Sequence, residues 1–216
     1  MKWLLGVLGR LKYVSVELAV LTLLLVGVTA GLYSVGGWPF WREWAGFLWL
    51  GALLGGLLCW TRWHWLVVGG YALLSGALTS LGWFGRLGNA GLELDGVRLR
   101  LLLLMERLRG WGQLWAETGA IYDRAAGIVL GCWLAWLVGV VLSRAVLRGR
   151  HPLRGGLPAA GLLAYCLFTS GRGVGLLVAF AVLLMMAEAY AAYRRVQVRW
   201  DAEGVDWPFQ IGRAHV

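Results

Sequence analysis

Few side chains in this sequence have the type and position that chemistry within a membrane would need. Glu17 and Glu188 are carboxylates near the ends of long apolar runs. An ionisable group inside such a run is a candidate proton or ion site. Glu17 lies close to Lys12 and Arg10, which could pair with it. Glu188 lies shortly before Arg194. We expect an interfacial structural role for both carboxylates, with a proton or ion site as the alternative.

Nucleophilic catalysis would need a cysteine or serine beside a histidine. The three cysteines, Cys59, Cys132 and Cys166, each lie inside an apolar run, which predicts buried small hydrophobic side chains. Their spacing matches no disulfide framework or metal-ligand pattern. Neither His64, among tryptophans, nor His151, before a proline, has a cysteine or serine partner at the same depth. The sequence therefore predicts no catalytic residue, no cofactor and no metal site.

Glycine is abundant, with 33 residues. The stretch 171–175 is glycine-rich, but no strand precedes it, so it predicts a turn between helices instead of a phosphate-binding loop. Pairs at small-xxx-small spacing, such as Gly51 with Gly55 and Gly127 with Gly131, allow membrane helices to approach closely. Such spacings also arise by chance in a chain this rich in glycine.

The composition indicates a membrane protein. Hydrophobic residues make up 60% of the chain, charged residues 14%, and the mean hydropathy is +0.69. A soluble domain has about 25% charged residues, so this chain needs lipid around its outer face. Its formal net charge is +9. The charges lie between apolar runs, which favours a role in membrane topology over nucleic-acid binding.

The apolar runs predict an all-α fold: a polytopic membrane helix bundle of about six transmembrane helices, each near the ~20 residues that a bilayer requires. The predicted spans are 14–34, 45–60, 65–84, 125–146, 153–170 and 173–193. The whole transmembrane helical domain covers 1–210. Short connections join the second span to the third and the fifth to the sixth, so both pairs are predicted to be antiparallel hairpins.

Basic residues set the predicted orientation, because cytoplasmic loops are enriched in lysine and arginine. The topology-setting residues are Lys2, Arg10, Lys12, Arg144, Arg148, Arg150, Arg154, Arg194 and Arg195. Placing the N-terminus in the cytoplasm puts all of them on the cytoplasmic side, together with Arg62. We therefore expect a multi-pass protein of the cell (plasma or inner) membrane, with the lipid bilayer as its partner.

The segment 87–124 is the main predicted element that does not span. The apolar run within 99–109 is too short to cross a bilayer and is interrupted by Glu106 and Arg107. It predicts one or two amphipathic helices at the outer interface. A connector that rests on lipid is the favoured interpretation, and a lid over the bundle is the alternative.

We interpret the last six residues, 211–216, as encoded by sequencing-adapter DNA. The codons ATC GGA AGA GCA CAC GTC encode this peptide, and they match a common sequencing adapter. We expect the gene to have been truncated there and 211–216, including Arg213 and His215, to be a read-through tail; a genuine polar tail is the alternative.

Three segments resemble the N-terminal membrane region of bacterial membrane-anchored transglutaminase-like proteins of the TgpA type. They are the amphipathic stretch 101–111, the basic loop 148–158 and the juxtamembrane stretch 194–209. The resemblance covers nearly the whole chain to Gln210. It implies that a further span leads to an extracytoplasmic papain-like domain with a Cys-His-Asp triad, which is absent from this sequence.

The resemblance thus implies an anchor module of a transglutaminase-like protein, truncated before its catalytic domain, and no enzyme activity in this chain itself. Two alternatives remain open. One is an independent small transporter, against which we count the lack of charge in the middle of any predicted span. The other is a scaffold for envelope assembly.

Overall fold

The computed structural model describes residues 2–34, 41–61, 64–86, 124–148, 151–171 and 174–203, with part of 102–117. Side chains at 2–14, 81, 83–86, 124–126 and 201–203 lie outside that description. So do the predicted tail 211–216 and the basic residues Arg62 and Arg150.

Long helices account for nearly all of the described residues. They are α1 (Lys2–Ser34), α2 (Trp41–Cys59), α3 (Trp65–Arg86), α5 (Arg124–Leu147), α6 (Pro152–Ser170) and α7 (Val174–Glu203). The described part of the chain contains no strand, so the predicted all-α class is confirmed. Each long helix contains one of the six predicted spans or coincides with it to within a few residues.

The first and last long helices of the chain are longer than predicted. α1 begins at Lys2 instead of residue 14, and α7 ends at Glu203 instead of residue 193. The prediction followed the apolar runs, which mark the lipid-exposed part of a helix. No proline interrupts 2–13 or 194–203, so the helical backbone continues beyond those runs into the polar flanks.

Three helical stretches are long and apolar enough to cross a membrane: Ser15–Ser34, Gly127–Leu147 and Val174–Trp200. Trp65–Ser80 in α3 is a shorter apolar stretch. Arg42 and Glu43 lie in the first turn of α2, and α6 contains prolines and glycines. Neither helix is among the three stretches. Length and composition therefore support a membrane protein. They identify three of the six predicted spans.

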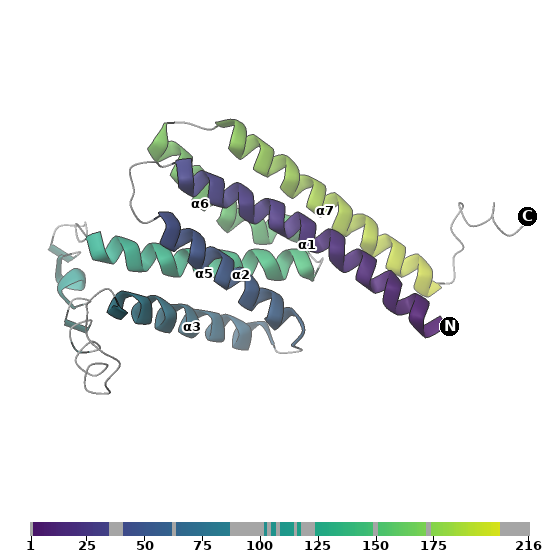
Figure 1. Ribbon diagram of the computed structural model, residues 1–216, viewed down its shortest axis with the longest axis horizontal. Helices are drawn as coiled ribbons and strands as arrows, with labels where there is room; N and C mark the ends of the chain where they lie inside the picture. The colour runs from purple at the N-terminus through teal and green to yellow at the C-terminus, as the bar shows by residue number, and fades with distance from the viewer. Residues whose placement is uncertain are drawn as a thin grey trace, which may run out of the picture.

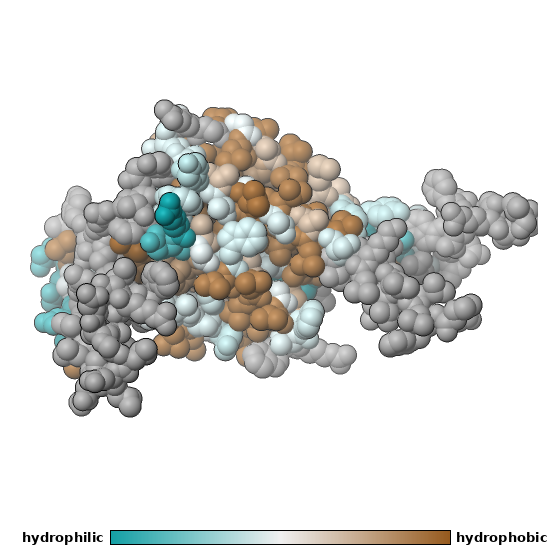
Figure 2. Space-filling model, viewed as in Figure 1, coloured by the Kyte–Doolittle hydropathy of each residue, from teal (hydrophilic) through white to brown (hydrophobic). Residues whose placement is uncertain are grey.

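The surface agrees with a membrane environment. On the face in Figure 2, apolar residues gather over the middle of the bundle, and the more hydrophilic residues lie towards its ends. Large exposed side chains of the bundle include Leu53, Leu74 and Leu78, each more than 60% exposed. Lipid chains are the solvent that such a surface needs.

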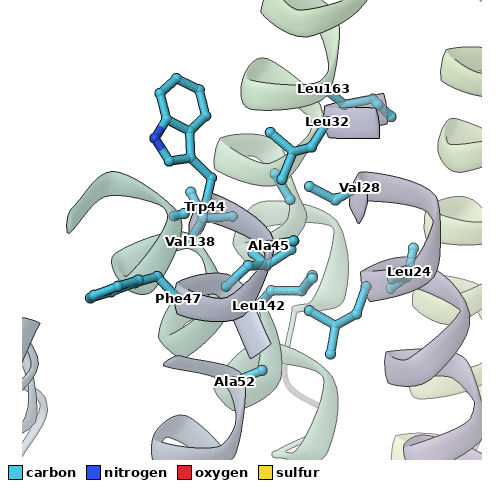
Figure 3. Close-up of a cluster of buried hydrophobic side chains, with 14 of the residues drawn as sticks. Leu24, Val28, Leu32, Trp44, Ala45, Phe47, Ala52, Val138, Leu142 and Leu163 are labelled. Atoms are coloured by element: carbon cyan, nitrogen blue, oxygen red, sulfur yellow. The ribbon is translucent and has the colours of Figure 1, made fainter. Parts of the chain in front are cut away.

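α1 and α5 occupy the centre of the bundle (Figure 1). α1 contacts α2, α5, α6 and α7, while α5 contacts α1, α2, α3 and α6. The most extensive contact joins α2 and α5. In Figure 3, Leu24, Val28 and Leu32 of α1 face the buried side chains of α2 and α5, such as Ala45 and Leu142. α3 lies at the edge, mainly against α5.

Glycines bring the α2 and α5 backbones together. A methyl group at Gly51 or Gly55 would overlap backbone atoms of α5, and one at Gly139 would overlap the backbone of α2. The predicted close approach at Gly51 and Gly55 is thus confirmed. Of the other predicted pair, Gly131 packs against α2, whereas a methyl group at Gly127 would meet nothing.

The described residues between 102 and 117 are helical, and most of them are exposed. Trp111 is the buried one among them. Helical structure in this segment agrees with the prediction. Its position at an outer interface stays a prediction, because residues 87–101 and 118–123 lie outside the description.

The glycine contact predicts opposite effects for one substitution at two sites. Gly139→Ala inserts a methyl group against the α2 backbone, so we expect a loss of about 1–3 kcal/mol in the free energy of unfolding. Gly70→Ala in α3 meets open space, so we expect no loss, or a gain of up to about 1 kcal/mol from better helix propensity. Thermal unfolding in detergent, followed by tryptophan fluorescence, measures both. Equal effects at the two sites would contradict the packing.

Candidate functional site

Charged side chains from α1, α5, α7 and the connection between α5 and α6 lie at one edge of the bundle. This charged edge consists of Glu17, Arg144, Arg148, His151, Glu188, Arg194 and Arg195. It lies where α5 ends and α6 begins, beside α1 and the second half of α7 (Figure 1). Several residues predicted to set the topology therefore lie together in space.

Glu17 on α1 forms an ion pair with Arg194 on α7. The Glu17 side chain is only 7% exposed, and that of Arg194 is 29% exposed. A buried carboxylate is costly unless it is paired, so this contact fixes α7 against α1. The sequence predicted Lys12 or Arg10 as the partner of Glu17, and the side chains of both lie outside the described residues. The described partner is Arg194, from the last long helix.

Glu188 joins α7 to the start of α6. Its Oε2 accepts a hydrogen bond from the Leu153 backbone N–H at 3.0 Å, and its Oε1 lies 3.2 Å from Arg195 Nη2. Because His151 makes no side-chain cap at the start of α6, Glu188 satisfies one of the free N–H groups there. A carboxylate also interacts favourably with the positive end of the helix dipole. The basic partner is Arg195, the residue after the Arg194 that the sequence places close to Glu188.

His151 Nδ1 lies 3.9 Å from Glu188 Oε1. Its neighbour is thus a carboxylate already bound to a helix terminus, and not a cysteine or serine. The second described histidine, His64, is exposed, and its Nδ1 accepts the Leu66 N–H at the start of α3. Both described histidines therefore lie at the start of a helix, His151 before α6 and His64 before α3.

Arg144 and Arg148 lie on the other side of the charged edge, next to the end of α2. Arg148 Nη2 donates a hydrogen bond to the Thr61 carbonyl at 2.7 Å. The Cys59 thiol approaches the Arg144 carbonyl at 4.0 Å. These contacts link the connection after α2 to the end of α5.

The remaining predicted topology residues are less fully described. Lys2, Arg10 and Lys12 lie on the first turns of α1, where only the backbone is described. Arg154 is exposed in the first turn of α6. Arg150 falls outside the described residues. The structure thus places Arg144, Arg148, Arg194 and Arg195 at one edge, but it shows no bilayer and no orientation. The prediction of a cytoplasmic edge remains a prediction.

Cys132 and Cys166 are buried, as predicted, and Cys59 is half-buried. All three are free thiols. Within the residues that the structure describes, no three histidine, cysteine or acidic side chains gather as metal ligands would. The contacts of the charged edge link α1 to α7, α7 to the start of α6, and Arg148 to the connection after α2. Sequence reasoning missed the Glu17–Arg194 pair because no local pattern connects two residues at opposite ends of a chain.

Comparison with known proteins leaves the family open. No protein-family model matches the chain, and no curated protein or solved structure matches it. The charged edge is therefore interpreted from its own geometry.

The buried ion pair predicts a large loss of stability when one partner is removed. Arg194→Gln leaves the Glu17 carboxylate buried without its cation, and we expect a loss of about 3 kcal/mol in the free energy of unfolding. Arg195→Gln is the matched control, because its ion pair with Glu188 is more exposed; its loss should stay below about 1 kcal/mol.

The double variant Glu17→Gln/Arg194→Gln shows how much of the stability loss comes from the unpaired charge of Glu17. We expect it to be more stable than Arg194→Gln alone, because no charge remains buried. Denaturant unfolding in detergent measures all four proteins. Equal losses for Arg194→Gln and Arg195→Gln would contradict the structural role of the Glu17 pair.

Proposed function

We propose that this chain is a membrane-embedded anchor module that holds the next part of a longer transglutaminase-like protein at a fixed place on the bundle. The observation that carries the proposal is the Glu17–Arg194 ion pair, which joins the first long helix to the last. Glu188 adds a second contact between α7 and α6. A segment that follows α7 would therefore leave the membrane from a fixed position, as an anchor requires.

The proposal includes six membrane crossings, by α1, α2, α3, α5, α6 and α7. α2 and α6 have 19 residues each, and such a helix is about 28 Å long, close to the ~30 Å of a bilayer core. Leu57 on α2 and Phe168 on α6 are exposed at 64% and 88%. In water these side chains would be costly to expose, whereas lipid accommodates them.

The interior favours an anchor over a transporter. Among the described side chains, the buried polar or charged residues are Glu17, Ser80 and Ser143. The two serines donate hydrogen bonds to carbonyls of their own helices. Substrate and ion sites of secondary transporters usually lie near the bilayer midplane and use polar groups. The described interior of this bundle offers apolar packing there instead.

We assign the charged edge to the cytoplasmic side of a bacterial cell membrane. Support comes from its arginines, since lysine and arginine near the ends of spans favour the cytoplasm. With six crossings, the N-terminus and the end of α7 both lie in the cytoplasm. One further span would then carry a Cys-His-Asp domain to the outside. No catalytic role is assigned to the described residues themselves.

Topology mapping tests the orientation. Reporter fusions after Ser34, after Arg86 and after Ser170 should give high periplasmic phosphatase activity and low cytoplasmic fluorescence in a bacterial host. Fusions after Thr61, after Arg148 and after Glu203 should give the reverse pattern. The same phosphatase signal on both sides of α2 or of α6 would exclude that helix as a span.

The gene itself tests the anchor assignment. The anchor predicts that an uninterrupted genomic sequence continues beyond the codon for Gln210 into a seventh apolar span and a domain with cysteine, histidine and aspartate. It also predicts codons for 211–216 different from those of the adapter. A stop codon close to Gln210 would remove the anchor assignment and leave an independent membrane protein, such as an envelope-assembly scaffold.

A further inference from the structure

Arg144 has a buried nitrogen without a hydrogen-bond partner. Its Nη1 is inaccessible to solvent, and no acceptor contacts it in the part of the chain that the structure describes. A buried donor left unpaired is unfavourable, and more so when the group is charged. Arg144 lies in the last turn of α5. A helix that holds a guanidinium in this state gains stability from any anion that reaches it.

The surroundings of Arg144 are positive. The described ionisable groups that act on it are Arg148 and the Cys59 thiol. No described carboxylate pairs with either arginine. The nearest acids along the charged edge, Glu17 and Glu188, are already bound to Arg194 and to Arg195 with the α6 terminus. Among the described residues, the two arginines therefore form a positively charged site without a paired carboxylate.

Arg148 is held in place by its hydrogen bond to the Thr61 carbonyl. Its guanidinium keeps further N–H donors, because one guanidinium carries five. Two neighbouring guanidinium groups suit a phosphate, whose oxygens accept paired N–H bonds in a planar fork. A single carboxylate would satisfy one fork, whereas a phosphate has oxygens for both.

The site lies beside exposed tryptophans. Trp60 and Trp65, which flank the connection after α2, are 88% and 67% exposed. Tryptophan favours the level of lipid headgroups. Leu57 lies in the last turn of α2, four residues before Thr61. It is 64% exposed and would face acyl chains. Phosphate and acyl chains of one lipid would thus meet the arginines and Leu57 together.

We propose that Arg144 and Arg148 bind the phosphate group of an anionic phospholipid at the junction of α2 and α5. Basic pockets between membrane helices on the cytoplasmic side bind anionic headgroups in this way. A zwitterionic headgroup fits less well, because no described carboxylate remains to hold its ammonium. The inference rests on the membrane insertion in the proposed function, but not on the transglutaminase-like assignment.

The experiment compares lipid retention in the full chain. The protein is reconstituted in nanodiscs of phosphatidylcholine and phosphatidylglycerol, extracted in mild detergent, and its bound lipids are quantified by mass spectrometry. We expect wild type to be enriched in phosphatidylglycerol. Arg144→Gln/Arg148→Gln should lower this enrichment about ten-fold, the loss expected for a hydrogen bond between charged groups.

The matched control is Arg154→Gln/Arg199→Gln, which removes the same charge from exposed positions at the same end of the bundle. We expect it to keep the enrichment. Arg144→Lys/Arg148→Lys keeps the charge but loses the planar fork, so we expect an enrichment between those of wild type and the glutamine variant. Equal retention in wild type and the glutamine variant would overturn the site. Equal loss in the control would also overturn it, because general attraction would then explain the enrichment.

Inorganic phosphate distinguishes a lipid from a soluble anion. Phosphate lacks the acyl chains that Leu57 would contact, so we expect millimolar phosphate to displace little phosphatidylglycerol. Complete displacement would overturn the lipid assignment in favour of a free phosphate. A failure of the lipid site would leave the topology and gene predictions unchanged, because neither depends on a bound lipid.

Discussion

The bundle depends on the close approach of α2 and α5. Between helices in lipid the hydrophobic effect gives little drive to associate, because acyl chains are as apolar as leucine. Packing must supply that drive, and glycine permits the closest packing. Gly51, Gly55 and Gly139 let the two backbones touch. α5 then carries contacts to α1, α3 and α6, so the positions of these helices follow from the α2–α5 contact.

Ion pairs add to packing in holding α7 against the bundle. α7 lies on the outside of the bundle, with contacts to α6 and α1. Its outer face is apolar and has no described protein partner, so packing holds it on one side only. Two polar contacts hold α7 further. Glu17 on α1 pairs with Arg194 on α7, and Glu188 on α7 accepts a hydrogen bond from the start of α6. Burying a charge pair gives little net stability but a definite register. For an anchor, the register of the last helix is the property that matters.

The sequence predicts the helices well and their partners poorly. Apolar runs locate all six long helices, because the need to satisfy backbone groups in lipid makes helix the default. Their ends were misplaced in α1 and α7, where helix continues into polar residues. Gly51 and Gly127 have the same spacing pattern, yet only Gly51 lies at a contact. Spacing alone cannot distinguish them, because the facing helix is set by the fold. The Glu17–Arg194 pair and the unpaired Arg144 depend on the fold in the same way.

We infer that α7 is fixed relative to α1, so that the bundle presents a rigid end. Spin labels at Leu18 on α1 and Val198 on α7, both exposed, report on this directly in a cysteine-free variant. Pulsed electron paramagnetic resonance in proteoliposomes gives the distribution of distances between them. We expect one narrow distribution that broadens when Arg194 is replaced by glutamine. A broad distribution in the parent protein, unchanged by that substitution, would contradict it.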